Sequence, residues 1–133
     1  MQPILLTVLA ALAGGEPATT AEDPVTAATT TVANQHVAVS VLSAMYYCEH
    51  KRWPESIGAV QVFHQRSKFP LHVKPDWAML GAEGSSYTIS QDTLTLTTGA
   101  DAIARAHKVT STNKPPGCAG GNLDVNAGIE IGE

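Results

Sequence analysis

The segment NQHVAVSVLSAMYYCEHK, residues 34–51, constrains the fold more than any other part of the chain. Five residues recur at helical spacing and form one apolar face: Val37, Val41, Ala44, Met45 and Cys48. The polar stripe between them is narrow and consists of Ser40, Ser43, Tyr47 and then His50 or Lys51. A helix with so little polar surface is packed on several sides. The segment therefore predicts a core helix.

A second helix is expected to start at Pro54. Proline is tolerated at the first helical position, where its missing N–H would have no partner anyway. Glu55 in the first turn suits the positive end of the helix dipole. Residues 57, 60 and 63 or 64 then repeat at helical spacing, and Pro70 ends the run because it disfavours helical geometry at the residue before it.

The rest of the chain has the alternating pattern of antiparallel strands that are exposed on one face. Apolar and polar residues alternate in residues 71–74, 86–90 and 93–97. Ser90–Asp92 predicts a hairpin turn, and Thr98–Asp101 predicts another. In residues 102–109 the alanines favour a helix and the hairpin context favours a strand; we choose a strand. Two short segments around Asn126–Gly128 predict a small terminal hairpin.

The first 33 residues differ in character from the rest. Residues 4–13 form an apolar run of ten, too short to cross a bilayer as a helix, and Ala11-Leu12-Ala13 has the form of a cleavage site. We expect residues 1–13 to be a signal peptide or an anchor. Residues 14–33, rich in Ala, Thr, Gly and Pro, predict a flexible linker or tether, with a helix near its end as the alternative. Residues 34–133 then form a single domain that is exported, either periplasmic or secreted.

The net charge of −4 argues against a dedicated nucleic-acid binder. The charge is polarised along the folded part of the chain. Residues 49–74 carry five bases and two acids, whereas residues 75–133 carry three bases and seven acids. Such asymmetry favours an anionic partner on the first part, although a solvated basic face beside helix ends has the same pattern.

The chain has two cysteines, Cys48 and Cys118. An even number of cysteines in an exported chain predicts a disulfide. Cys118 lies in a glycine-rich segment that can adapt to meet the first helix. The alternative is two free thiols in a cytosolic chain.

The stretch YYCEHKRWPE, residues 46–55, has the composition of a metal or catalytic site and equally of a junction between two helices. Consecutive helical residues point about 100° apart, so Cys48, Glu49 and His50 cannot converge on one ion. Neither HExxH, CxxC, GxSxG nor a glycine-rich phosphate loop occurs in the chain. We therefore expect no enzyme, no metal and no cofactor. The alternative is a small secreted hydrolase or metal-dependent enzyme in which His50, His64 and His72 converge.

The best binding candidates combine cations with an aromatic residue, the types that dominate interface hot spots. They are Lys51, Arg52, Trp53, Arg66 and Lys68. We interpret them as a face for a protein or cell-envelope partner. The alternative is that Trp53 caps the core, together with Trp77, where the helices meet the sheet.

A core helix with an aromatic pair near its end, a charged turn, Arg52-Trp53-Pro54, a second amphipathic segment and an antiparallel meander resembles the globular part of type IV pilins and pseudopilins. The resemblance covers about residues 34–118 and implies a first helix packed on a small sheet, with a disulfide that pins a C-terminal loop. It implies no particular site residue.

Together these patterns predict an α+β domain in which two N-terminal helices pack on a small antiparallel sheet and one disulfide joins Cys48 to Cys118. The predicted function is non-enzymatic binding of a protein or envelope partner, in an accessory, inhibitor or pilin-like role.

Overall fold

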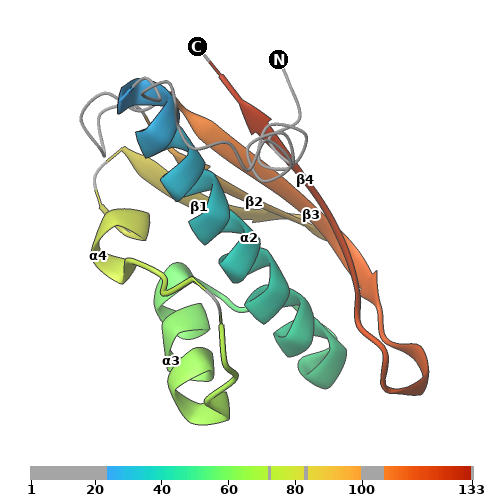
Figure 1. The fold of residues 1–133 in the computed structure, drawn as a ribbon. Coiled ribbons are helices and arrows are strands. Elements are labelled where there is room, and N and C mark those ends of the chain that lie inside the picture. The colour runs from blue at the N-terminus through green and yellow to red at the C-terminus, as the bar shows by residue number, and fades with distance from the viewer. Residues whose placement is uncertain (1–23, 72, 83, 100–106, 133) are drawn as a thin grey trace, which may run out of the picture.

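A computed structural model describes residues 24–71, 73–82, 84–99 and 107–132, and Figure 1 shows their arrangement. These residues have an α+β fold with three α-helices: α2 (Pro24–His50), α3 (Ile57–Ser67) and α4 (Trp77–Leu80). Four antiparallel strands form one sheet in the order β1 (Ser85–Ser90), β2 (Thr93–Thr98), β3 (Val109–Gly117) and β4 (Asp124–Ile131), with a short 3-10 turn, η1 (Ala119–Gly121), before β4. The predicted fold class and antiparallel sheet are confirmed. Helix α4 is an addition that the sequence patterns did not predict.

Helix α2 begins at Pro24, ten residues before the start that the apolar pattern indicates. Residues 24–33 are thus helical, as the alternative for the end of the linker expected. Thr29, Val32 and Ala33 are buried, and the backbone N–H of His107 donates to Thr29 Oγ1 at 2.9 Å. Small side chains bury little area each, but packing against a neighbouring element is what stabilises most protein helices. The predicted signal peptide or anchor and the rest of the linker lie outside the described residues.

The hairpin turn between β1 and β2 is confirmed. Ser90 pairs with Thr93, and Gln91 between them has a φ of 58°, in the left-handed region that a tight turn requires. The remaining strand pairs are also antiparallel neighbours, with Leu96 opposite Ser111 on β3 and Ser111 opposite Ile129 on β4. Each strand therefore follows its predecessor across the sheet as a meander.

Two predicted strand features are wrong. The described residues of 71–74 form no strand but lie in the connection from α3 to α4. Pro70 and Pro75 flank this segment and lack the N–H that a strand ladder uses. The predicted terminal hairpin is also replaced, because β4 is one continuous strand that pairs with β3 from Asp124 to Ile131. Residues 100–106 lie outside the described residues. They include most of the strand predicted for residues 102–109 and part of the turn predicted for Thr98–Asp101.

The core lies between α2 and the sheet. Buried residues from both sides form one cluster, with Val32, Val39 and Leu42 on α2 and Leu96 and Val109 on β2 and β3. In Figure 1, α2 crosses the sheet, and α3 and α4 lie to one side of it. Helix α3 contacts α2 and α4. The end of α2 is thereby held next to α3, which creates the site described below.

Helix α2 turns toward the sheet the face that we expected to be its polar stripe. His36, Ser40 and Ser43 are at most 3 % exposed, whereas Val37 on the expected core face is 44 % exposed. The sheet explains the inversion, because its inner surface is itself partly polar. The two ring nitrogens of His36 lie 3.0 Å from Ser111 Oγ and 2.9 Å from Thr98 Oγ1. His36 thereby has the partners that a buried polar group requires, whereas the buried Oγ atoms of Ser40 and Ser43 have no hydrogen-bond partner among the described residues.

Candidate binding cleft between two helices

The junction between α2 and α3 is anchored to the β1–β2 hairpin. The Trp53 side chain is 4 % exposed, and its indole N–H donates to the Asp92 carbonyl at 2.9 Å. The Tyr87 hydroxyl of β1 donates to the carbonyl of Pro54. Burial, and then the nearby Tyr46 hydroxyl, raise the pKa of Tyr87, so this donor stays neutral. Trp53 is therefore part of the core, as the alternative interpretation expected, and offers a partner little surface.

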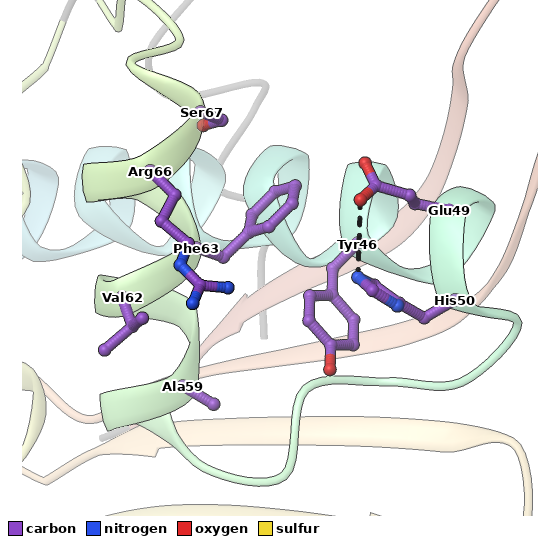
Figure 2. A pocket seen from close by; sticks show the side chains of 8 residues that line it. All are labelled: Tyr46, Glu49, His50, Ala59, Val62, Phe63, Arg66 and Ser67. Atoms are coloured by element: carbon purple, nitrogen blue, oxygen red, sulfur yellow. Dashed lines mark ion pairs between the residues drawn. The ribbon is translucent and has the colours of Figure 1, made fainter.

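A cleft of about 560 Å³ lies between the last turns of α2 and helix α3. Figure 2 shows its lining: Tyr46, Glu49 and His50 on α2, and Ala59, Val62, Phe63, Arg66 and Ser67 on α3. This size is within the range of sites that bind small ligands or a few side chains of a partner.

Helix α3 is positioned by both of its ends. Its N-cap is Ser56, whose Oγ accepts from the Ala59 N–H at 3.1 Å, so the helix begins at Ile57 and not at Pro54. A serine cap satisfies an N–H group that otherwise has no partner in the first turn. At the other end, Lys68 has a left-handed φ of 53° and donates its N–H to the His64 carbonyl. Residues 59, 62, 63 and 66 of the helix that these two ends bound line the cleft.

Aromatic contacts form the wall between the two helices. The ring of Tyr46 lies 5.3 Å from that of Phe63 in an edge-to-face arrangement and 4.2 Å from that of His50. Such pairs stabilise by about 0.5–1.5 kcal/mol beyond the area that they bury. Val62, one turn before Arg66 on α3, is 50 % exposed. The cleft thus has a wall of packed aromatic rings and one exposed aliphatic residue, Val62.

Charged groups flank this apolar surface on both helices. In Figure 2 the guanidinium of Arg66 lies beside Val62, across the cleft from Glu49 and His50. Glu49 Oε1 and His50 Nε2 are 3.4 Å apart and both side chains are well exposed. An arginine on such a surface can bind a carboxylate through two parallel hydrogen bonds. The arrangement suits a ligand that carries both an apolar side chain and an acid.

Of the five residues of the predicted binding face, Arg66 lines the cleft. Lys51, Arg52 and Lys68 are exposed, and each lies within two residues of a lining residue in the sequence. Lys51 has a left-handed φ of 62°, which ends α2 and turns the chain toward Trp53. Trp53 itself points into the core, as described above. A binding role for these residues stays a prediction.

The sequence patterns missed the lining residues Val62 and Phe63 as candidates for binding. Phe63 belongs to the helical repeat of α3, which alone indicates a buried face, and Val62 lies outside that repeat. Only the position of α3 beside the end of α2 shows that this face borders an open cleft. The spacing of Val62 and Arg66, one helical turn apart, is the one signal in the sequence that could have indicated the site.

The described histidines do not meet. His36 lies on the buried face of α2, where its ring contacts the sheet, and His50 lines the cleft. The His64 ring is 6.2 Å from that of Trp77, and its Nε2 lies 3.2 Å from the Phe69 carbonyl. Among the described residues there is no group of three or more His, Cys, Asp or Glu that could hold a metal ion. His72 of the alternative histidine site lies outside the described residues.

The disulfide between Cys48 and Cys118 is present, with 5.6 Å between the two Cα atoms. It joins the last turn of α2 to the end of β3, next to η1. Disulfides are typical of oxidising compartments outside the cytoplasm, which agrees with the predicted export. In the part of the chain that the structure describes, no helix has the length and apolar character needed to cross a membrane.

No family model, curated protein or solved structure matched this chain. The resemblance to type IV pilins and pseudopilins therefore stays a prediction from the sequence.

Proposed function

We propose that this protein is an exported, non-enzymatic binding domain whose α2–α3 cleft receives a segment of a protein partner at the cell envelope. The segment carries an acidic side chain and an apolar one. The observation that supports this most directly is the exposed pair Val62 and Arg66, which border a cleft with an aromatic wall. An accessory, inhibitor or pilin-like role would each use such a site.

Charge supports the acidic part of the ligand. Residues 49–68 contain four bases, Lys51, Arg52, Arg66 and Lys68, against the acids Glu49 and Glu55, while the whole chain has a net charge of −4. This local excess of positive charge on an anionic protein would guide an acidic segment to the helical end of the molecule. Rim cations of this kind contribute mainly to the rate and specificity of association.

An exposed apolar side chain in the cleft supports the apolar part of the proposed ligand. Val62 is 50 % exposed although it lies next to Phe63, which packs on Tyr46. A leucine or phenylalanine of the partner would cover this valine and extend the aromatic cluster. Interface energy is usually concentrated in a few such anchors surrounded by polar residues. The acid would then bind at Arg66 and fix the direction of the segment.

Two substitutions test the proposal: Arg66→Glu and Val62→Glu. The probes are a short peptide with a Leu-Glu or Phe-Asp pair, measured by fluorescence polarisation, and the proteins of the envelope fraction, measured by affinity capture and quantitative mass spectrometry. Each substitution should weaken peptide binding by about tenfold or more, because one removes the cation and the other places an acid beside the apolar contact. Both should also remove the same captured protein.

The matched controls are Lys114→Glu, which also reverses a positive charge, and Val125→Glu, which makes the same substitution as at Val62; both positions are exposed, on β3 and β4. They should leave binding and capture unchanged. If all four variants bind the peptide and capture proteins as the unaltered chain does, the cleft is not the binding site and the proposal fails.

A further inference from the structure

The buried contact between α2 and the sheet contains three polar atoms that have no hydrogen-bond partner among the described residues. They are the Oγ atoms of Ser40 and Ser43 on α2 and the Oδ1 atom of Asn113 on β3. Each of these residues is at most 3 % exposed, so bulk water does not solvate the three atoms. Buried polar atoms are nearly always hydrogen-bonded, either to the protein or to an ordered water molecule. Three unpartnered atoms in one contact therefore point to a bound ligand.

Two contacts align α2 with β3. His36 Nδ1 lies 3.0 Å from Ser111 Oγ, and Cys48 is bonded to Cys118, which directly follows the last residue of the strand. The residue numbers rise in the same direction in both elements, so α2 and β3 run side by side and point the same way (Figure 1). Residues of α2 between His36 and Cys48 therefore lie beside residues of β3 between Ser111 and its end.

This alignment places Asn113 next to the two serines. Ser111 and Asn113 are both buried and are two residues apart, so they lie on the same face of β3. A strand rises about 3.3 Å per residue, which puts Asn113 about 7 Å beyond Ser111. A helix rises about 1.5 Å per residue, which puts Ser40 about 6 Å and Ser43 about 10 Å beyond His36. The amide of Asn113 thus lies at the level of the two hydroxyls.

The hydrogen-bonding roles of the three groups are complementary. Nδ2 of Asn113 donates to the Leu94 carbonyl at 3.2 Å, which orients the amide and leaves Oδ1 as an acceptor. A serine hydroxyl can donate to such an acceptor, yet neither Ser40 nor Ser43 bonds to it directly. Polar groups that lie close together without a direct hydrogen bond are commonly bridged by a water molecule.

We propose that Ser40, Ser43 and Asn113 bind one structural water molecule between α2 and β3. The water donates a hydrogen bond to Asn113 Oδ1 and accepts one from each serine hydroxyl, which gives it the three hydrogen bonds that a buried water typically makes. None of the three side chains carries a charge, so a small neutral ligand fits this site and an ion does not. The water extends the polar contact of His36 toward the disulfide and holds the second half of α2 on the sheet.

The first experiment is a high-resolution crystal structure of the purified chain. It should show one ordered water within hydrogen-bonding distance of Asn113 Oδ1 and of both serine Oγ atoms. A direct hydrogen bond from Ser40 or Ser43 to Asn113, with no water between the two elements, would overturn the proposal.

The second experiment compares the stability of Ser40→Ala and Ser43→Ala by urea unfolding. Each substitution removes one hydrogen bond to the water and should lower the ratio of folded to unfolded chain about fivefold. Alanine has the higher helix propensity, so such a loss cannot come from the helix itself. Thr31→Ala, which removes an exposed hydroxyl from the same helix, is the control and should not lower the stability.

The opposite result is equally clear. A hydroxyl that is buried without any partner destabilises the fold, so its removal would leave the stability unchanged or raise it. If both serine variants are at least as stable as the unaltered chain, the serines bind no water and the proposal fails.

Discussion

At the scale of the residue, His36 is the most informative side chain of the core. It is fully buried on α2, and its two ring nitrogens contact hydroxyls that belong to two neighbouring strands. One nitrogen of a neutral imidazole donates and the other accepts, and a hydroxyl can serve either role. This contact fixes the rotation of α2 on the sheet and requires the histidine to be neutral.

Acid should therefore weaken the fold through His36. Burial lowers the pKa of His36 to about 4 from its ordinary value of 6.5. The unfolded chain binds a proton here as the pH falls below 6.5, whereas the folded chain does not until about pH 4. The free energy of unfolding should thus fall by about 3 kcal/mol between these pH values. The groups that face the ring are the hydroxyls of Thr98 and Ser111, neither of which titrates.

Urea unfolding at a series of pH values measures this effect, with His36→Gln as the variant that cannot titrate. Carboxylates also protonate near pH 4, so the relevant quantity is the difference between the two profiles. The variant should be less stable at pH 7 but should lose less stability on acidification. If acid lowered the stability of the unaltered chain and of His36→Gln equally, His36 would not be the source of the acid sensitivity.

Trp53 provides a second test at this scale. Trp53→Phe keeps most of the ring in the core but removes the N–H that donates to the Asp92 carbonyl. We expect a loss of about 1–2 kcal/mol in the free energy of unfolding, from the lost hydrogen bond and the smaller ring. Trp77→Phe is the matched control, because Trp77 is partly buried and contacts His64 through its ring. An equal loss in the two variants would argue against an anchoring hydrogen bond at Trp53.

At the scale of the element, α2 determines where the functional surfaces lie. Its inward face carries His36, Ser40 and Ser43, its outward face carries the exposed Val37, and its last turns border the cleft. The helical period of its valines is real, but that period indicates only that these residues share a face. The polar inner surface of β2 and β3 determines which face of α2 is buried.

The disulfide connects two elements whose other contacts are few, namely the end of α2 and the turn between β3 and β4. It closes a loop of 70 residues, for which the chain-entropy model predicts a stabilisation of about 4 kcal/mol. The double variant Cys48→Ser/Cys118→Ser should lose about this much in urea unfolding, and its stability should not respond to a reducing agent. The unaltered chain should lose a similar amount on reduction. If reduction leaves its stability unchanged, the bridge contributes nothing to the fold.

At the scale of the whole molecule, the cations near the cleft lie where α2 and α3 end, while β4, the last strand of the sheet, carries Asp124 and Glu130. The disulfide holds the start of β4 near the end of α2, since Leu123, which precedes Asp124, lines one pocket together with Cys48 and Glu49.

Local patterns in the chain were sufficient to predict the fold class, the β1–β2 hairpin and the pairing of Cys48 with Cys118. The helices, strands and hairpin follow from periodicity and turn residues, which act over short distances. The disulfide follows from the cysteine count, because two cysteines admit only one pairing. The rotation of α2, the continuous strand β4 and the burial of Trp53 could not be predicted in this way. Each depends on the surface that another element presents: the hydroxyls of Thr98 and Ser111, the long edge of β3 and the carbonyl of Asp92. A side chain of α2 is buried or exposed according to what the sheet offers it, and that surface exists only once the strands have assembled.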